Sequence, residues 1–304
     1  MFGMSARASA TLVLAAIATA ATAQEPTFRS ETELVGIAVT VTDRQGGLLA
    51  DLSRDDFEVF EDGQAQTIRY FARGDDLDEG LDLHIGLLFD TSGSMETDSQ
   101  LSKSAAIRFL NTLTQARDIT LVDFDTEVRV TRFGQEDFPR LVERIRSRKP
   151  LGFTAMYDAL GVYLDGAARL QGRKILVIFT DGGDTRSAIR FSDALTLVRA
   201  SDVTIYSVGF LQNQPGGARS DQRLRLTQIG SESGGEAFFP SSMKQIEEAY
   251  DRIVSRIRAQ YSLGYVSKNT ATDGAWRKVE VRVRQSAAIG TRIQARKGYF
   301  APYR

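Results

Sequence analysis

The sequence predicts an α/β fold in which a doubly wound, mostly parallel sheet is inserted into a small β-sandwich. Three observations support this fold class. Residues 83–89 and 174–180 are nearly continuous apolar runs, which are typical of parallel strands covered on both faces. Between such runs apolar residues recur at helical spacing, so strands and helices alternate along the middle of the chain. Both ends of the chain instead show the two-residue alternation of half-buried strands.

The first 23 residues have the layout of a secretory signal peptide. Arg7 supplies a positive charge, residues 12–17 form a short apolar core, and residues 21–23 read Ala-Thr-Ala, an A-x-A cleavage site. The apolar stretch is too short and too rich in alanine to span about 30 Å of hydrocarbon. We therefore expect cleavage near Ala23 and an exported chain, periplasmic or secreted, with no membrane span after cleavage.

Residues 24–78 and 261–304 are expected to form the sandwich. The expected strands are residues 35–41, 57–61 and 66–71 at the N-terminal end and 261–266, 276–283 and 291–295 at the C-terminal end. The dipeptide Asp62-Gly63 is a strong signal for a hairpin turn between two of them. Neither end has enough strands to bury a face by itself, whereas about six strands together suffice for a small sandwich.

Residues 79–260 contain the strand–helix alternation. The expected strands are residues 83–89, 119–124, 127–133, 174–180, 203–210 and 236–239, of which 127–133 is expected to be an antiparallel edge. The expected helices lie around residues 101–113, 138–148, 156–167, 188–200, 224–229 and 242–258. Residues 211–221 are rich in Gly, Pro and Gln and are therefore expected to form a long loop.

Composition limits the chemistry of the chain. It has 38 basic and 39 acidic residues, a net charge of −1, so no nucleic-acid partner is expected. The absence of cysteine excludes zinc–thiolate sites, iron–sulfur clusters and cysteine nucleophiles. The single histidine, His84, lies inside an apolar run and is interpreted as a packed core residue. Oxygen ligands from Asp, Glu, Ser and Thr remain, and these favour hard cations such as Mg²⁺.

Oxygen side chains gather where the predicted parallel strands end. Asp90, Ser92 and Ser94 follow the first buried strand, Asp181 follows the central one, and Thr154 stands just ahead of a helix. Because ligands of open α/β sheets bind at the carboxyl ends of the strands, we expect these five side chains to meet. They suit a small hard cation, Mg²⁺ first, with Mn²⁺ and Ca²⁺ as alternatives.

These three segments, in this order, resemble the metal-ion-dependent adhesion site of the von Willebrand factor type A (VWA) domain. The resemblance covers residues 81–260 and implies the Rossmann-like fold of that domain. The flanking segments are similar to those of a bacterial exported family of VWA proteins. They are residues 41–43 (VTD), 56–59 (DFEV), 61–63 (EDG), 261–265 (YSLGY) and 296–299 (RKGY).

The resemblance implies a division of labour among the site residues. In the ligand-bound state the hydroxyls of Ser92, Ser94 and Thr154 touch the metal directly, while Asp90 and Asp181 act mainly through bound waters or hydrogen bonds. Neutral ligands leave most of the cation's charge uncompensated, so a Glu or Asp of a partner protein can complete the octahedron. The sequence therefore predicts an exported, metal-dependent protein-binding or adhesion module rather than an enzyme.

The loops around the metal are expected to decide which partner binds. The residues nominated for this rim are Glu96, Thr97, Asp98, Phe153, Gln212 and Asn213. Asp184, shortly after Asp181, either supports the ligands from behind or is a solvated loop carboxylate.

Two other functions compete with this prediction. One is a structural scaffold of the cell envelope in which the metal is incidental. The other is a phosphatase-type hydrolase with Asp90 as nucleophile, but such enzymes need a second carboxylate two residues on, where this chain has Ser92. The nearest basic residues, Lys103 and Arg186, stand outside any recognisable phosphate-binding motif. The basic segment 140–149 is interpreted as a solvated helix face.

Overall fold

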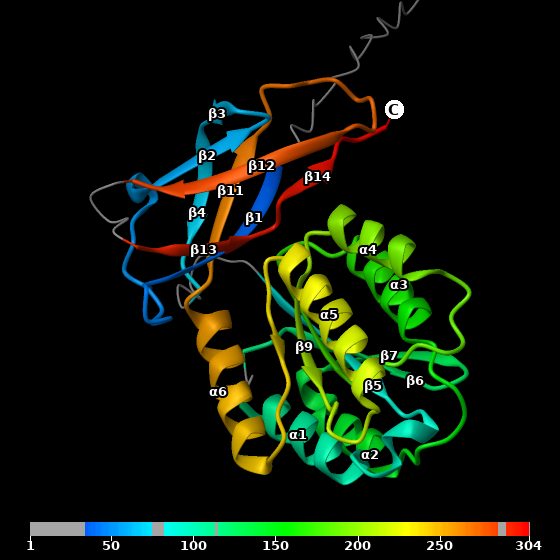
Figure 1. Cartoon of the computed structure of the whole chain (residues 1–304). Coiled ribbons are helices and arrows are strands. Elements are labelled where there is room, and N and C mark those ends of the chain that lie inside the picture. Colours follow the sequence, from blue (N-terminus) through cyan, green and yellow to red (C-terminus); the bar gives the residue numbers. More distant parts are fainter. Residues whose placement is uncertain (1–33, 75–81, 113–114, 285–289, 304) are drawn as a thin grey trace, which may run out of the picture. The chain divides into compact units, whose positions relative to one another are not determined.

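Figure 1 shows the computed structural model of the chain, which describes residues 34–74, 82–112, 115–284 and 290–303. The signal peptide expected at residues 1–23 lies outside these ranges. Residues 33–304 form one compact unit of the chain.

A six-stranded sheet forms the centre of the α/β part, in the order β10-β9-β8-β5-β6-β7. Its strands are β5 (Leu83–Asp90), β6 (Asp118–Phe124), β7 (Val128–Gly134), β8 (Arg173–Thr180), β9 (Thr204–Gly209) and β10 (Ala237–Phe238). β7 pairs antiparallel with β6 at one edge, and the other pairs are parallel. The chain passes from β5 to β6 on one side and later to β8 on the other, so the strand order switches between β5 and β8. The predicted fold class is confirmed.

Helices cover both faces of this sheet (Figure 1). One face is covered by α1 (Ser99–Thr112), α2 (Phe138–Ser147) and α6 (Met243–Arg258), and the other by α3 (Met156–Ala167), α4 (Phe191–Ala200) and α5 (Gly216–Glu232). Successive side chains of β8 enter opposite cores, Val177 packing with the first group and Ile178 with the second. Burial on both faces explains the continuous apolar runs of the sequence.

The two ends of the chain form two antiparallel sheets, β13-β1-β11-β4 and β14-β12-β2-β3. Their strands are β1 (Leu34–Thr42), β2 (Phe57–Glu61), β3 (Gln64–Gln66), β4 (Ile68–Ala72), β11 (Tyr261–Val266), β12 (Trp276–Val283), β13 (Arg292–Ala295) and β14 (Gly298–Phe300). Both sheets contribute to one core, in which Val39, Val59, Leu263 and Val279 meet. Since β1 pairs with β11 in one sheet and β2 pairs with β12 in the other, the N-terminal and C-terminal segments share each sheet, as the insertion requires.

Some boundaries differ from the expectation. The single strand expected at residues 66–71 is divided into β3 and β4, which belong to different sheets, and β14 was not anticipated. The loop expected at residues 211–221 ends at Pro215, because α5 already begins at Gly216. Two glycines disfavour a helix start, but burial of Leu226 and Ile229 further along α5 outweighs that preference. The hairpin turn at Asp62-Gly63 is confirmed, with φ angles of 49° and 83°.

Arg173 of β8 links the α/β part to both segments that join it to the sandwich. Its Nη1 donates to the carbonyl of Gly74 (3.1 Å), and its Nη2 donates to the carbonyl of Ile257 near the end of α6. Only residues 259–260 separate α6 from β11. Burial lowers the pKa of the Arg173 guanidinium from its ordinary value.

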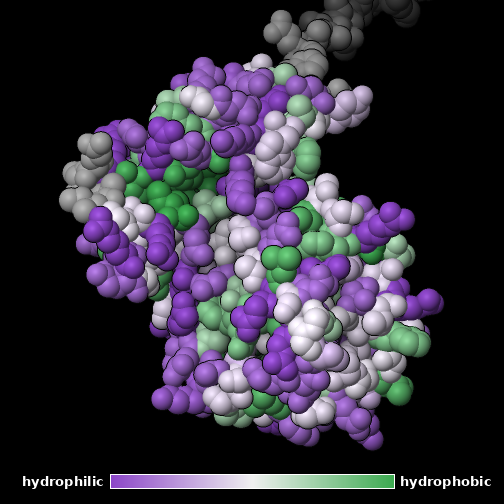
Figure 2. Space-filling view, viewed as in Figure 1, coloured by the Kyte–Doolittle hydropathy of each residue, from purple (hydrophilic) through white to green (hydrophobic). Residues whose placement is uncertain are grey.

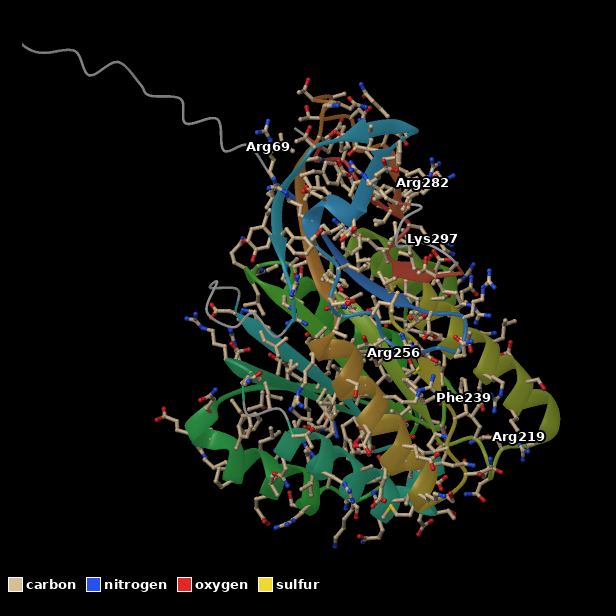
Figure 3. All side chains as sticks on the ribbon, turned by 90° about the vertical axis from the view of Figure 1, so that its left-hand side faces the viewer. Arg69, Arg219, Phe239, Arg256, Arg282 and Lys297 are labelled. Atoms are coloured by element: carbon tan, nitrogen blue, oxygen red, sulfur yellow. The ribbon has the colours of Figure 1, made fainter. Side chains whose placement is uncertain are left out.

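Two further side chains, labelled in Figure 3, connect the helices to the C-terminal strands. Arg256 of α6 donates from Nη1 to Oε1 of Gln294 in β13. Lys297, which precedes β14, donates from Nζ to Oε1 of Glu232 at the end of α5 (2.7 Å). Hydrogen bonds with α5 and α6 therefore hold the C-terminal strands of the sandwich against the α/β part.

The face of the molecule in Figure 2 is mostly hydrophilic, and apolar side chains gather on it over the sandwich. None of the helices in the described ranges combines the length and the apolar content needed to cross a bilayer.

A buried carboxylate fastens the two sheets of the sandwich together. Glu61 of β2 is 2% exposed and accepts hydrogen bonds from the hydroxyls of Tyr265 (2.7 Å), Tyr299 (2.8 Å) and Ser267 (2.5 Å). Burial and the hydrogen bond to Glu61 raise the pKa of Tyr299 to about 12. Three of the flanking motifs, EDG, YSLGY and RKGY, thus meet at one point, where their polar groups form hydrogen bonds with one another.

Replacing Glu61→Ala is expected to lower the free energy of unfolding by about 3 kcal/mol, because the buried hydroxyl of Tyr265 and the partly buried hydroxyls of Tyr299 and Ser267 lose their acceptor. Urea unfolding followed by circular dichroism measures this change. Glu58→Ala is the matched control, since Glu58 lies on the same strand but its side chain is 43% exposed beside Arg284. Equal losses in the two variants would contradict the structural role given to Glu61.

Candidate metal centre

The predicted site lies at the carboxyl ends of the paired strands β5 and β8. Phe89 is opposite Phe179 in the register, so Asp90 and the loop that carries Asp181 leave the sheet side by side. A third segment, the loop before α3, is tied to the first by a hydrogen bond from Gly93 N to Gly152 O (3.1 Å). The structure therefore brings the three predicted segments to one edge of the sheet.

Asp90 is almost completely enclosed, with 2% of its surface exposed. Its Oδ1 accepts a hydrogen bond from the Ser92 amide (2.9 Å), and its Oδ2 accepts one from the Thr180 hydroxyl (2.5 Å). Burial, together with the nearby charge of Asp181, raises the pKa of Asp90 to about 7, although both hydrogen bonds act in the opposite direction. A positive charge at this place would relieve the repulsion between the two carboxylates.

Asp181 is also buried, and burial raises its pKa as well. Its Oδ1 accepts from the Gly183 amide (3.2 Å), and a hydrogen bond with Ser94 favours its ionised form. The hydroxyl oxygens of Ser94 and Ser92 lie 3.1 Å apart. Two carboxylates and two hydroxyls thus form one connected group.

Thr154 is 3% exposed and lies beside the loop that follows Asp181. Its amide donates to the Thr185 hydroxyl (3.0 Å), and its carbonyl accepts from the amides of Thr185 (2.9 Å) and Arg186 (3.0 Å). The backbone of Thr154 is therefore fixed relative to the second carboxylate.

Asp184 anchors the start of α3. It is half-buried and accepts hydrogen bonds from the Tyr157 amide (3.0 Å), the Ser187 amide (3.1 Å) and the Ser187 hydroxyl (2.6 Å). These bonds do not fit a freely solvated loop carboxylate. They connect the loop after β8 to the first turn of α3, directly after Thr154, and an acidic group there is favoured by the helix dipole.

The two loops nominated as the rim touch each other. Asn213 donates from Nδ2 to Oδ2 of Asp98 (3.1 Å). Asp98 is half-buried, and the other nominated residues are exposed: Glu96, Thr97, Phe153, Gln212 and Asn213.

Gln214 belongs to the site but was not predicted from the sequence. Its Nε2 donates to Oδ2 of Asp181 (2.9 Å). Arg219, labelled in Figure 3, donates to the carbonyls of Gln212 (2.7 Å) and Gln214 (3.1 Å) and so folds this segment against the first turn of α5. Within a segment rich in Gln, no local pattern distinguishes the residue that turns toward the carboxylate.

Asp123 was also missed, and the interpretation of residues 140–149 as a solvated helix face is wrong in part, although Arg140, Arg146 and Lys149 are exposed. Asp123 is fully buried near the end of β6 and pairs with Arg129 (3.1 Å), Arg144 (3.2 Å) and Arg148. Arg144 and Arg148 are therefore not part of a solvated helix face. Arg148 begins the loop that leads to Thr154, so this ion cluster anchors that loop. An Asp inside the apolar run LVDF was the available signal.

The side chains that could contact a cation at this edge are two carboxylates and the hydroxyls beside them. Within the described ranges no group of three or more His, Cys, Asp and Glu side chains could hold a metal ion. A cation at this edge would therefore need ligands besides the two carboxylates, such as hydroxyl oxygens or water. Mg²⁺ suits such a site, because it prefers oxygen ligands and retains part of its water.

Residues 84–252 match the family model of the von Willebrand factor type A domain. The comparison with curated proteins gave no match.

Among solved structures, the chain is similar to a von Willebrand factor type A protein from Catenulispora acidiphila, with 14% identity and a TM-score of 0.50 over 91% of this chain and 75% of that one. It is also similar to a mutant of the PilB minor pilin from Streptococcus sanguinis (13% identity, TM-score 0.48), over 61% of this chain and 63% of the pilin. A third is the vWF domain of the type V pili tip protein Mfa5 from Porphyromonas gingivalis (11%, 0.48), over 64% of this chain and 99% of that one. At these identities the likeness shows the fold alone.

Asp90→Asn is expected to stabilise the metal-free chain at pH 8 by on the order of 2 kcal/mol, because it removes an ionised group from a buried place beside Asp181. The pKa of Asp90 in the folded chain, about 7, lies above its ordinary value of 3.8. The stability of the parent should therefore fall as the pH rises through this window, and the variant should lack that part of the fall. Urea unfolding in EDTA at pH 5 and pH 8 measures both effects.

Glu96→Gln, at an exposed carboxyl group on the neighbouring rim, is the control and should leave the pH dependence unchanged. A variant at position 90 that is less stable than the parent at pH 8 would show that Asp90 is not under electrostatic strain.

Proposed function

Because this chain belongs to the von Willebrand factor type A domain family, we propose that it is an exported, metal-dependent protein-binding module. In this proposal Mg²⁺ is held where β5 and β8 end, and the metal site captures an acidic residue of a partner protein. The exported location rests on the signal-peptide pattern of residues 1–23.

The observation that carries the proposal is the pair of buried carboxylates beside a group of hydroxyls. Asp90 and Asp181 are 2% and 1% exposed, and among the described residues no Lys or Arg forms an ion pair with either. Two buried like charges are costly unless a cation compensates them. The hydroxyls of Ser92 and Ser94 are at hand to contact that cation.

Existing hydrogen bonds support the division of labour that the family resemblance implies. Both oxygens of Asp90 already accept from Ser92 and Thr180, and both oxygens of Asp181 accept from Gly183 and Gln214. These hydrogen bonds orient both carboxylates and occupy their oxygens. Direct contact then falls to Ser92, Ser94 and Thr154.

A bound Mg²⁺ would supply a positive charge and a coordination position for a carboxylate. The chain's own part is to hold neutral hydroxyl ligands in place, so that the charge is not cancelled before a partner arrives. Ser92 stands where a phosphatase-type enzyme would need its second carboxylate, and it hydrogen-bonds Ser94 instead, which favours binding over phosphoryl transfer. Electrostatic complementarity then selects acidic partners.

Removing one hydroxyl ligand is expected to weaken Mg²⁺ binding about tenfold or more, and removing Asp90 should abolish it. The variants are Thr154→Ala and Asp90→Ala, with Thr97→Ala as a matched control, because Thr97 is an exposed hydroxyl residue on the same edge. Titration calorimetry with MgCl₂ gives the affinities. Unchanged Mg²⁺ affinity in Asp90→Ala would refute the metal site.

Capture of a partner from the native envelope fraction is expected to require Mg²⁺ and to be lost in EDTA. The captured partner should also lose binding after its carboxyl groups are converted to amides, because the metal would then lack its acidic ligand. Immobilised parent chain and mass spectrometry of the eluate provide the measurement. A scaffold with incidental metal would instead hold its partner equally well in EDTA.

A further inference from the structure

The loop that leads to Thr154 exposes two large apolar side chains. Leu151 is 74% exposed and Phe153 is 62% exposed, one on each side of Gly152. Apolar side chains gathered on a surface, rather than scattered singly, indicate contact with another molecule.

The backbone of this loop is fixed, although its side chains are exposed. Leu151 N donates to Thr91 O (2.9 Å), and Phe153 N donates to the Thr126 hydroxyl (2.9 Å). Gly152 has a φ of +78°, and a Cβ there would lie 2.5 Å from Oγ1 of Thr126, so only glycine fits this turn. Leu151 and Phe153 are thus presented on a rigid support, which reduces the entropy lost when a partner binds.

The segments around the site carry charges of both signs. Lys149, two positions before Leu151, is exposed, and so is Arg186, whose amide donates to Thr154 O (3.0 Å). The other rim segment carries Glu96 and Asp98. A partner's carboxylate is favoured close to Lys149 or Arg186, whereas it is repelled close to Glu96 or Asp98.

We propose that Leu151 and Phe153 select the partner, and that they fit a protein segment in which one metal-directed Asp or Glu has a large apolar residue within two positions. This proposal rests on the proposed function. A carboxylate alone would leave both apolar side chains in water, whereas an adjacent Leu, Ile, Phe, Met or Trp would cover them. The apolar contact thus adds to the charge recognition and makes it specific.

The test uses random heptapeptides displayed on phage, selected on the immobilised full chain in Mg²⁺ and eluted with EDTA. Three proteins are compared: the parent, the double variant Leu151→Ser/Phe153→Ser, and Leu224→Ser. Leu224 is 64% exposed on α5 and therefore matches the loss of an exposed apolar side chain elsewhere. Peptides from the parent and from the control should share one acidic residue with an apolar neighbour.

The double variant should still enrich acidic peptides but without the apolar neighbour. A synthetic peptide taken from the parent's pool should bind the double variant about tenfold more weakly, while Mg²⁺ affinity measured by calorimetry stays unchanged. That combination supports the proposal, because the metal site is intact and only the added contact is lost.

Three results would overturn it. Acidic peptides without an apolar bias in the parent's pool would refute the role of Leu151 and Phe153 and leave the proposed function standing. An EDTA-eluted pool without acidic residues would refute the proposed function and this inference with it. Mg²⁺-dependent self-association of the parent in sedimentation, absent from the double variant, would show that a second copy of the chain covers the loop.

Discussion

Asp90 and Asp181 stand at the ends of two paired parallel strands, and the register of that pairing brings their charges together in a place with little water. The surrounding loops are arranged about this constraint. Amides and hydroxyls donate to all four carboxylate oxygens, which orients the two groups without neutralising them. The pKa of both carboxyl groups remains raised, because these donors do not offset the burial of the two groups.

The sandwich provides a frame for this arrangement. Its sheets combine strands from both ends of the chain, so β-sheet pairing holds together the two segments that enter and leave the α/β part. Glu61 joins the two sheets from inside, and Arg173 bonds both connecting segments. The edge of the sheet that carries the carboxylates lies at the opposite ends of the strands from Arg173 and is left to the loops.

Rigid backbone with exposed side chains is the common property of these loops. The ion cluster of Asp123 with Arg144 and Arg148 holds the start of the loop that contains Thr154, and hydrogen bonds from Leu151 and Phe153 hold its middle. A surface preorganised in this way loses little conformational entropy on binding. The structure therefore supports a recognition role more readily than a role that needs large movement at this edge.

The sequence by itself determined the α/β class, the strands β5 and β8 and the three segments that carry Asp90, Thr154 and Asp181, because burial on both faces and turn chemistry leave local patterns. Only the tertiary structure decided which side chains from distant segments meet. Gln214 reaches Asp181, and Arg148 reaches Asp123, through loop paths that no local periodicity encodes. The division of residues 64–72 between two sheets has the same cause, since β3 pairs with neighbouring β2 whereas β4 pairs with β11, far along the chain.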